Sequence, residues 1–182
     1  MSERQHFVKE LEDLKLTILN MAALSRQALK NANTAYLERN DTLAQEVIDG
    51  DRRINALELE IDQKALKLLA LEQPMAKDLR AILGTIKISN ELERIADQAV
   101  NIAERTLFLS QYPPLEPVAS PERLMETTDQ MIDLAVSAFV DENADQAIKI
   151  RQMDDMADQY TLETSGHDSI YAKARRPRKS GL

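Results

Sequence analysis

Two rows of oxygen-bearing side chains mark the part of this sequence that is best suited to bind an ion. The first row steps by 3, 4, 4 and 3 residues and consists of Asn90, Glu93, Asp97, Asn101 and Glu104. On a helix with about 100° of rotation per residue, these side chains fall within about 80° of one another. The second row steps by 4, 3 and 4 residues and consists of Asp51, Asn55, Glu58 and Asp62. Each row therefore forms a polar stripe along one side of a helix.

The two stripes predict a cation site. If the helices that carry them form an antiparallel hairpin, Asp51 lies between Glu93 and Asp97 in height. Three carboxylates that converge within a few ångströms repel one another, so they either take up protons or bind a cation. Oxygen ligands alone suit hard ions such as Mg²⁺, Mn²⁺ or ferric iron and argue against a closed structural zinc site. Asn101, one turn further along, supplies another oxygen.

The same spacing also has a simpler interpretation. Carboxylates four residues apart on a charged helix usually form a solvated face or pair with neighbouring bases, here Arg94 or Arg52. The chain lacks the Glu-x-x-His pairs of ferritin-like bundles, because His6 and His167 both lie near its ends. It also contains no cysteine and hence no thiolate ligand. Spacing alone therefore does not decide between a solvated acidic face and a cation site.

A diverged internal repeat at an offset of 103 residues points to a second site. The identical pairs are Gln27 and Gln130, Ala32 and Ala135, Ala35 and Ala138, Asn40 and Asn143, Ala44 and Ala147, and Asp51 and Asp154. A repeated unit is usually a supersecondary block. Asp158 falls where Asn55 stands, so Asp154 and Asp158 predict a second metal site. The repeat ends near Leu162, before the helix that would carry the partner motif. The second site therefore lacks half of its ligands unless another subunit supplies them.

Hydrophobic periodicity predicts the helices that position these residues. Apolar side chains recur every three or four positions, which is the pattern of amphipathic helices. The pattern runs through residues 7–35, 43–71 and 79–107. Asn40 or Asp41 is expected to cap the second helix, and Pro74 is expected to open the third. Three antiparallel helices joined by short turns form a bundle, which we expect over residues 1–111.

The second half of the chain repeats only part of this plan. Four prolines between residues 112 and 121 interrupt any helix, so residues 112–120 are expected to be a linker. Ser120 with Pro121 is expected to begin a fourth helix, and Asp141 or Asn143 a fifth. Residues 121–163 then form a partial second repeat of two helices. The predicted fold class is all-α, with tandem three-helix bundles of which the second is incomplete.

Residues 164–182 have no apolar period and are expected to form a mobile basic tail. The chain as a whole carries a net charge of -8 at pH 7. An acidic body favours cations or basic partners over nucleic acid. The sequence has no apolar run of membrane-spanning length and no start typical of a secretion signal, so a cytoplasmic location is expected.

Residues 92–104, with the sequence LERIADQAVNIAE, resemble the third-helix signature of the PhoU family of bacterial phosphate-signalling regulators. The similarity covers residues 5–162 and includes Gly50, Asp51 and a proline at the start of the third helix. It implies two tandem three-helix bundles whose acid-x-x-x-Asp motifs hold metal ions, with iron, zinc, manganese and magnesium as the candidates. Asn55 departs from the family pattern, because an acid is common at that position. The second copy of the third-helix motif is missing.

The resemblance also implies a function. Family members are expected to be adaptors between the ATP-binding subunit of the phosphate ABC transporter and a membrane histidine kinase, and to repress the phosphate-starvation response when phosphate is plentiful. No glycine-rich phosphate loop and no catalytic triad indicate an enzyme. Two alternatives remain from the residues, a structural helical scaffold and a metal-storing or metal-dependent hydrolytic bundle.

The incomplete second repeat predicts self-association. Its two helices are expected to expose an apolar face formed by Met131, Ile132, Ala135, Phe139, Ile148 and Ile150. A monomer does not comfortably leave such a face in water. We therefore expect a homodimer in which these helices from two chains form a four-helix bundle.

Overall fold

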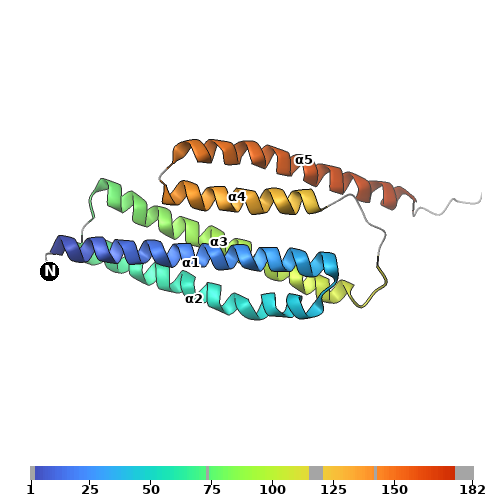
Figure 1. Cartoon of the computed structure of the whole chain (residues 1–182), viewed down its shortest axis with the longest axis horizontal. Coiled ribbons are helices and arrows are strands. Elements are labelled where there is room, and N and C mark those ends of the chain that lie inside the picture. Colours follow the sequence, from blue (N-terminus) through green and yellow to red (C-terminus); the bar gives the residue numbers. More distant parts are fainter. Residues whose placement is uncertain (1–2, 73, 115–120, 142, 175–182) are drawn as a thin grey trace, which may run out of the picture. The chain divides into compact units, whose positions relative to one another are not determined.

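The computed structural model describes residues 3–72, 74–114, 121–141 and 143–174, and within these ranges the chain is helical without any strand. Figure 1 shows the five helices, which are α1 (Glu3–Glu38), α2 (Asp41–Glu72), α3 (Ala76–Leu109), α4 (Glu122–Val140) and α5 (Ala144–Ala174). The predicted all-α class is confirmed. None of the described helices combines the length and the apolar character that crossing a lipid bilayer requires.

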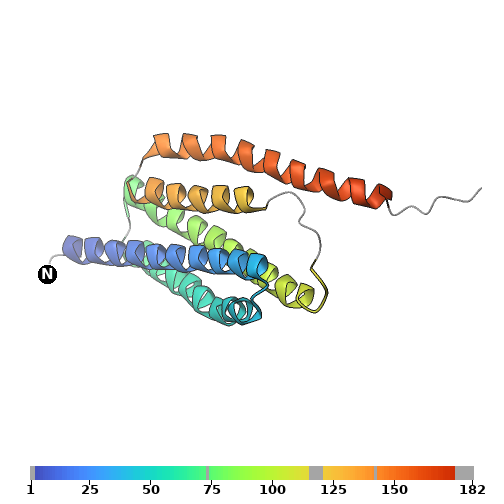
Figure 2. The same ribbon diagram turned by 45° about the vertical axis from the view of Figure 1, so that its right-hand side comes forward.

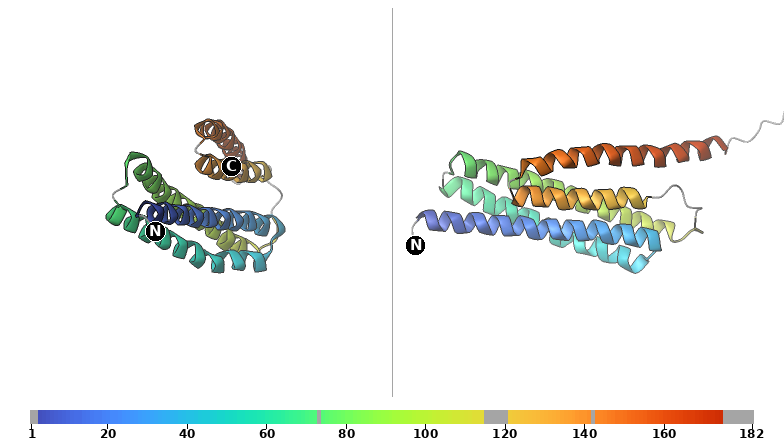
Figure 3. Two further views of the ribbon diagram at one scale, coloured as in Figure 1. Left: turned by 60° about the vertical axis from the view of Figure 1, so that its left-hand side comes forward. Right: turned by 45° about the horizontal axis from the view of Figure 1, so that its top comes forward.

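The chain divides into two compact units, Met1–Pro113 and Pro114–Leu182. This boundary falls within the proline-rich segment of residues 112–120, of which 115–120 lie outside the described residues. In the first unit, α1, α2 and α3 each pack against the other two. They run side by side along their length in Figure 2 and in both views of Figure 3, so they form a three-helix bundle. In the second unit, α4 and α5 pack as a hairpin.

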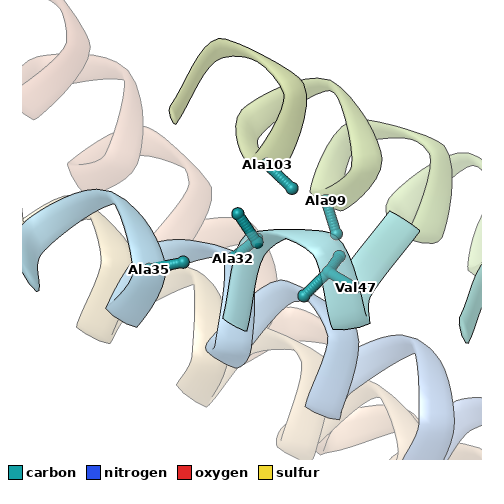
Figure 4. Close-up of a cluster of buried hydrophobic side chains, with 6 residues drawn as sticks. Ala32, Ala35, Val47, Ala99 and Ala103 are labelled. Atoms are coloured by element: carbon teal, nitrogen blue, oxygen red, sulfur yellow. The ribbon is translucent and has the colours of Figure 1, made fainter. Parts of the chain in front are cut away.

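The core of the first unit follows the predicted apolar stripes. Its buried aliphatic side chains include Leu14, Ile18, Met21, Ile54, Ile61, Leu68, Ile82 and Leu92. One part of the core is instead built from small residues, namely Ala32, Ala35, Ala44, Val47, Ala99 and Ala103. Figure 4 shows side chains of this alanine cluster from α1, α2 and α3 converging. Because the side chains at a contact set the distance between helix axes, the three helices can approach closely here.

The corner between the first two helices is repeated in the second unit. Asn40 caps α2 by accepting a hydrogen bond from the N–H of Leu43 at 3.0 Å. Asn143 caps α5 by accepting one from the N–H of Gln146 at 3.4 Å. The N–H of each asparagine also donates to the carbonyl five residues earlier, over 2.9 Å in both corners. Of the two candidate caps at each corner, the asparagine is therefore the one used, and the internal repeat extends to backbone hydrogen bonding.

The two corners differ in what covers them. Ala32 and Ala44 are fully buried, whereas their repeat counterparts Ala135 and Ala147 are exposed. In the first unit α3 contributes Ala99 to this surface, and the described part of the second unit contains no third helix. Of the side chains expected to form an exposed apolar face on α4 and α5, Ala135 and Ile148 are exposed. Three others are only partly buried, namely Met131, Phe139 and Ile150. The prediction was wrong for Ile132, which is buried.

Two predicted boundaries also require correction. Residues 164–174 were expected to belong to a mobile tail, but α5 continues to Ala174, and residues 175–182 lie outside the described residues. No proline lies between Pro121 and Pro177, so every residue of α5 has a backbone N–H to donate. The backbone hydrogen bonds of α5 can therefore continue where the apolar stripe has ended. Pro74 does not open α3, because Met75 is still extended (φ -80°, ψ 160°) and the helix begins at Ala76. Ser120 lies outside the described residues.

Candidate functional site

The bundle core fixes the rotation of the two helices that carry the acidic stripes. On α3, Leu92 and Ala96 are buried, so the adjacent Glu93 and Asp97 lie at the edge of the core. On α2, Ile54 is buried in the same way beside the stripe that begins at Asp51. α2 and α3 pack against each other along their length. The two polar stripes therefore border one seam.

Glu93 is the electrostatic centre of this site. Burial raises the pKa of the Glu93 carboxyl, and the negative charge of Asp97 raises it further. The charges of Glu58 and Asp51, both on α2, and a hydrogen bond with Asp97 act in the same direction. Carboxylates that repel one another in this way favour the protonated form of the group between them. The Glu93 carboxyl therefore keeps its proton to a higher pH than an isolated glutamate does.

The α2 side of the seam contains oxygen atoms without hydrogen-bond partners. Asn55 donates from Nδ2 to Asp51 Oδ2 at 2.8 Å, which fixes the two side chains against each other. The remaining oxygens, Asp51 Oδ1 and Asn55 Oδ1, are buried and accept no hydrogen bond, and the same holds for Asp62 Oδ1. A buried acceptor without a partner costs about 1–3 kcal/mol. A cation or a water molecule at the seam would satisfy these atoms.

The predicted site residues are brought together only in part. Asp51, Glu93 and Asp97 lie close enough for their charges to interact, and Asn101 is exposed one turn further along α3. Yet no three histidine, cysteine, aspartate or glutamate side chains of the described ranges stand where they would jointly hold an ion. Asp154 and Asp158 are both exposed on α5, without a third such group beside them in the described part of the chain.

The alternative of a salt-bridged face is weakened by the pairing of Arg94. Its Nη1 lies 2.8 Å from Glu91 Oε2, and both side chains are largely exposed. Spacing makes Arg94 a candidate partner for the acidic stripe, but in the structure it pairs with Glu91, which lies outside that stripe. Burial and then the charges of neighbouring carboxylates, rather than this base, shift the pKa of Glu93.

Sequence reasoning placed Glu58 in the α2 stripe but did not include it among the ligands. In the structure, the charge of Glu58 affects Glu93 more strongly than that of Asp51. Counting residues from the α2–α3 turn places Asp51 level with Glu93 and Asp97. This count fixes which α2 residue faces Glu93 only to within about one helical turn, so it does not distinguish Asp51 from Glu58. The regular spacing of Asp51, Asn55 and Glu58 was the signal that could have identified it.

Replacing Glu93 with glutamine is expected to stabilise the metal-free protein at neutral pH. Because the pKa of Glu93 is raised on folding, its favourable contribution is complete below the ordinary glutamate pKa and is lost as the pH rises through the raised value. Glutamine does not titrate, so the difference between Glu93→Gln and the parent should grow above the ordinary pKa. Urea unfolding in the presence of EDTA between about pH 4 and about pH 8 measures it.

The matched control for this pH series is Glu104→Gln, an exposed position on the same helix. Its free energy of unfolding should follow that of the parent within about 0.5 kcal/mol across the series. If the free energy of unfolding of Glu93→Gln changed with pH in parallel with that of the parent, the pKa of the Glu93 carboxyl would be the same in the folded and unfolded chain, which would contradict the prediction.

Comparison with known proteins shows which family this chain is similar to. A family model for the PhoU domain matches residues 18–106. The chain is 39% identical over 151 residues to the phosphate-specific transport system accessory protein PhoU homolog of Aquifex aeolicus, covering 83% of this chain and 68% of that protein. It is 36% identical over 155 residues to the accessory protein PhoU of Escherichia coli, covering 84% of this chain and 64% of that protein.

Solved structures show the same similarity. The crystal structure of PhoU from Pseudomonas aeruginosa superposes with a TM-score of 0.89 at 29% identity, covering 93% of this chain and 81% of that chain. The phosphate transport system regulatory protein PhoU from Streptococcus pneumoniae gives a TM-score of 0.85 at 27% identity, covering 93% of this chain and 80% of that chain. In each comparison the match extends over only part of the related protein.

Proposed function

The chain belongs to the PhoU family, and from that premise we propose that it regulates phosphate uptake and the phosphate-starvation response. The observation that carries this proposal is the 39% identity, over 83% of this chain, to a protein named as an accessory of the phosphate-specific transport system. We take the name accessory protein to mean a protein that acts by binding to components of the transport system. The proposed role is therefore that of a cytoplasmic adaptor and not of an enzyme.

The proposed partners are the ATP-binding subunit of the phosphate ABC transporter and the membrane histidine kinase of the phosphate two-component system. The names of the relatives support a partner within the phosphate transport system, and the acidic character of the chain, whose net charge is -8, suits a basic partner surface; the two specific partners rest on the family resemblance. Complementary charge on a partner would steer association and fix its orientation. A long helical bundle with stripes of distinct chemistry suits a protein that contacts two partners.

Binding to the purified ATP-binding subunit is expected to test the adaptor role. Immobilised full-length chain should bind this subunit, and separately the cytoplasmic part of the histidine kinase, with a dissociation constant in the micromolar range or below, where transient signalling contacts fall. Affinity should fall as salt increases if charge steers the encounter. Retention of neither partner, by a chain that remains helical in circular dichroism, would exclude the adaptor role.

The acidic seam is the proposed metal site. Asp51, Glu93 and Asp97 would supply carboxylate oxygens, and Glu58, Asn55 and Asn101 lie within the same two stripes. Support for a cation comes from two buried oxygens of Asp51 and Asn55 without a hydrogen-bond partner and from the repelling carboxylates around Glu93. Because no three carboxylates of the described residues are placed to hold an ion jointly, binding would require side chains at the seam to change rotamer. A bound ion would offset the repulsion among these carboxylates, which raises the pKa of Glu93. Magnesium, manganese and iron suit the oxygen ligands, and zinc is the further candidate.

Asp154 and Asp158 are proposed as half of a second, weaker metal site. They repeat the spacing of Asp51 and Asn55 at the offset of 103 residues. Both side chains are exposed, so they would not bind an ion tightly without ligands from another helix. The second site is thus expected to fill only at metal concentrations well above those that fill the first.

Self-association through α4 and α5 is proposed to give a homodimer. The support is the exposure of Ala135, Ala147 and Ile148 on helices whose counterparts in the first unit are covered by α3. Two such hairpins would complete a four-helix bundle. Sedimentation at about micromolar concentration should give the dimer mass, as affinities of stable dimers require. A monomer at this concentration would contradict the proposed pairing.

A further inference from the structure

A group of exposed leucine and methionine side chains lies near the turn between α2 and α3. Its members are Leu59, Leu66, Met75, Leu79 and Leu83. Leu66 is 63% exposed and Met75 is 80% exposed, so neither belongs to the bundle core. Single exposed apolar residues are common on protein surfaces, but a contiguous group indicates a binding surface.

Helical spacing places the group along the α2–α3 seam. Leu79 and Leu83 precede Glu93 and Asp97 by 14 residues each, which is about four turns, so all four lie in one sector of α3. On α2, Leu59 follows Asn55, and Leu66 follows Asp62, by four residues. Residues four apart are neighbours on a helix. The apolar group, called the leucine patch below, therefore extends the α3 stripe toward the turn and lies beside the turn-proximal end of the α2 stripe, where Asp62 stands between Leu59 and Leu66 in the sequence.

Ion pairs on the opposite side of α2 confirm which of its faces borders α3. Lys64 Nζ lies 2.6 Å from Asp13 Oδ2, and Lys67 Nζ lies 2.9 Å from Glu10 Oε2, so these lysines point toward α1. Leu59 and Leu66 lie on a different sector of α2 from Lys64 and Lys67. The side of α2 away from α1 is thus the side that carries the leucine patch and the acidic stripe.

We infer that the leucine patch and the adjacent acidic stripe together dock an amphipathic helix of a partner protein, apolar in one half and rich in lysine or arginine in the other. The apolar half would cover the leucine patch. The basic half would lie along Asp51, Glu58, Glu93 and Asp97, where complementary charge fixes the direction of the helix. From Leu79 to Asp97 the surface is about 27 Å long, which a partner helix of about 18 residues would span.

Other occupants fit this surface less well. A second copy of the chain that overlapped it fully would place acids against acids in a parallel arrangement, or acids against leucines in an antiparallel one. An anionic membrane would be attracted to neither half, because the acidic stripe repels its headgroups. Arg80 and Lys87 border the leucine patch on α3 and would meet acidic side chains at the edge of the partner helix. The inference goes beyond the proposed function and requires neither a bound metal nor the transporter.

A synthetic peptide of about 18 residues tests this inference, with leucines in its first half and lysines on the same face of its second half. Titration against the full chain in EDTA should show saturable binding, and hydrogen exchange should slow in residues 59–66 and 75–86. Leu66→Gln combined with Leu83→Gln should weaken binding at least about tenfold, as loss of interface anchors does. The matched control Leu16→Gln, at a leucine on α1 that is 65% exposed, should stay within about twofold.

Two peptide controls keep the test decisive even if the double variant fails to fold. A peptide with glutamate in place of lysine should bind at least about tenfold more weakly, because like charges meet. A peptide with the same composition in scrambled order should not bind. Equal binding of either control, no binding of the designed peptide, or stronger binding of the chain to phosphatidylglycerol vesicles than to the peptide would each overturn the inference. Because EDTA removes metal and no transporter subunit is present, none of these results bears on the proposed regulation.

Discussion

Replacing Glu93 with glutamine and Asp97 with asparagine is expected to abolish the stabilisation of the protein by metal ions. Both substitutions keep the shape of the side chain and remove its negative charge, so the helices should stay intact. For the parent, metal at a hundred times its dissociation constant should raise the free energy of unfolding by about 2.7 kcal/mol. The double variant should show no such increase. Elemental analysis of purified protein and urea unfolding with and without manganese, magnesium, iron or zinc measure the effect.

Glu91→Gln is the matched control for this prediction, because Glu91 lies on α3 two residues before Glu93 and pairs with Arg94 outside the acidic stripe. Its metal content and its metal-dependent stabilisation should equal those of the parent. Asp154→Asn with Asp158→Asn should likewise leave the tighter site unchanged. A double variant at Glu93 and Asp97 that retains the full metal content would exclude the seam as the metal site.

Replacing Ala32 with leucine is expected to lower the free energy of unfolding by about 1–3 kcal/mol, because three heavy atoms would enter a close-packed core. Ala32 is fully buried in the alanine cluster between α1, α2 and α3. Its repeat counterpart, Ala135, is exposed on α4 within a single chain, so at concentrations low enough to keep the chain monomeric Ala135→Leu should change stability by no more than about 0.5 kcal/mol. Urea unfolding followed by circular dichroism compares the two variants.

This pair of variants also tests how the second unit is covered. A large cost for Ala135→Leu would mean that the exposed face of α4 is packed in solution, as the proposed dimer requires. In that case sedimentation of the variant should show weaker association, whereas Ala32→Leu should leave association unchanged. Equal and small costs at both positions would contradict the close packing of the alanine cluster.

The fold was largely predictable from the sequence because its helices are long and strongly amphipathic. Stripes such as the one from Phe7 to Ala35 admit only a helix at that length, and asparagines at matching repeat positions mark two of the helix starts. The end of α5 was not predictable in this way, because a helix that lacks an apolar stripe gives no periodic signal. The start of α3 was misplaced since it depends on the backbone conformation of Met75, which side-chain type does not determine.

The candidate site was predictable to the level of the helix face but not of the individual contact. Spacing places Glu93 and Asp97 on one stripe, and packing beside Leu92 puts that stripe at the seam. Which residue of α2 comes nearest depends on a shift along the helix axis of less than one turn, so Glu58 was overlooked. The hydrogen bond between Glu93 and Asp97 depends on side-chain rotamers and on a proton, neither of which spacing specifies.

The asparagine corners bear on how the chain acquires its shape. At each corner, one amide side chain and one backbone N–H close a turn whose partners lie within five residues along the chain. Closing so short a loop costs little conformational entropy, and contacts between near neighbours form early in folding. Each helical hairpin can thus nucleate at its own bend, before any distant segment arrives. The sequences of the two helices in a duplicated hairpin can accordingly diverge widely, while the turn between them stays at the same position.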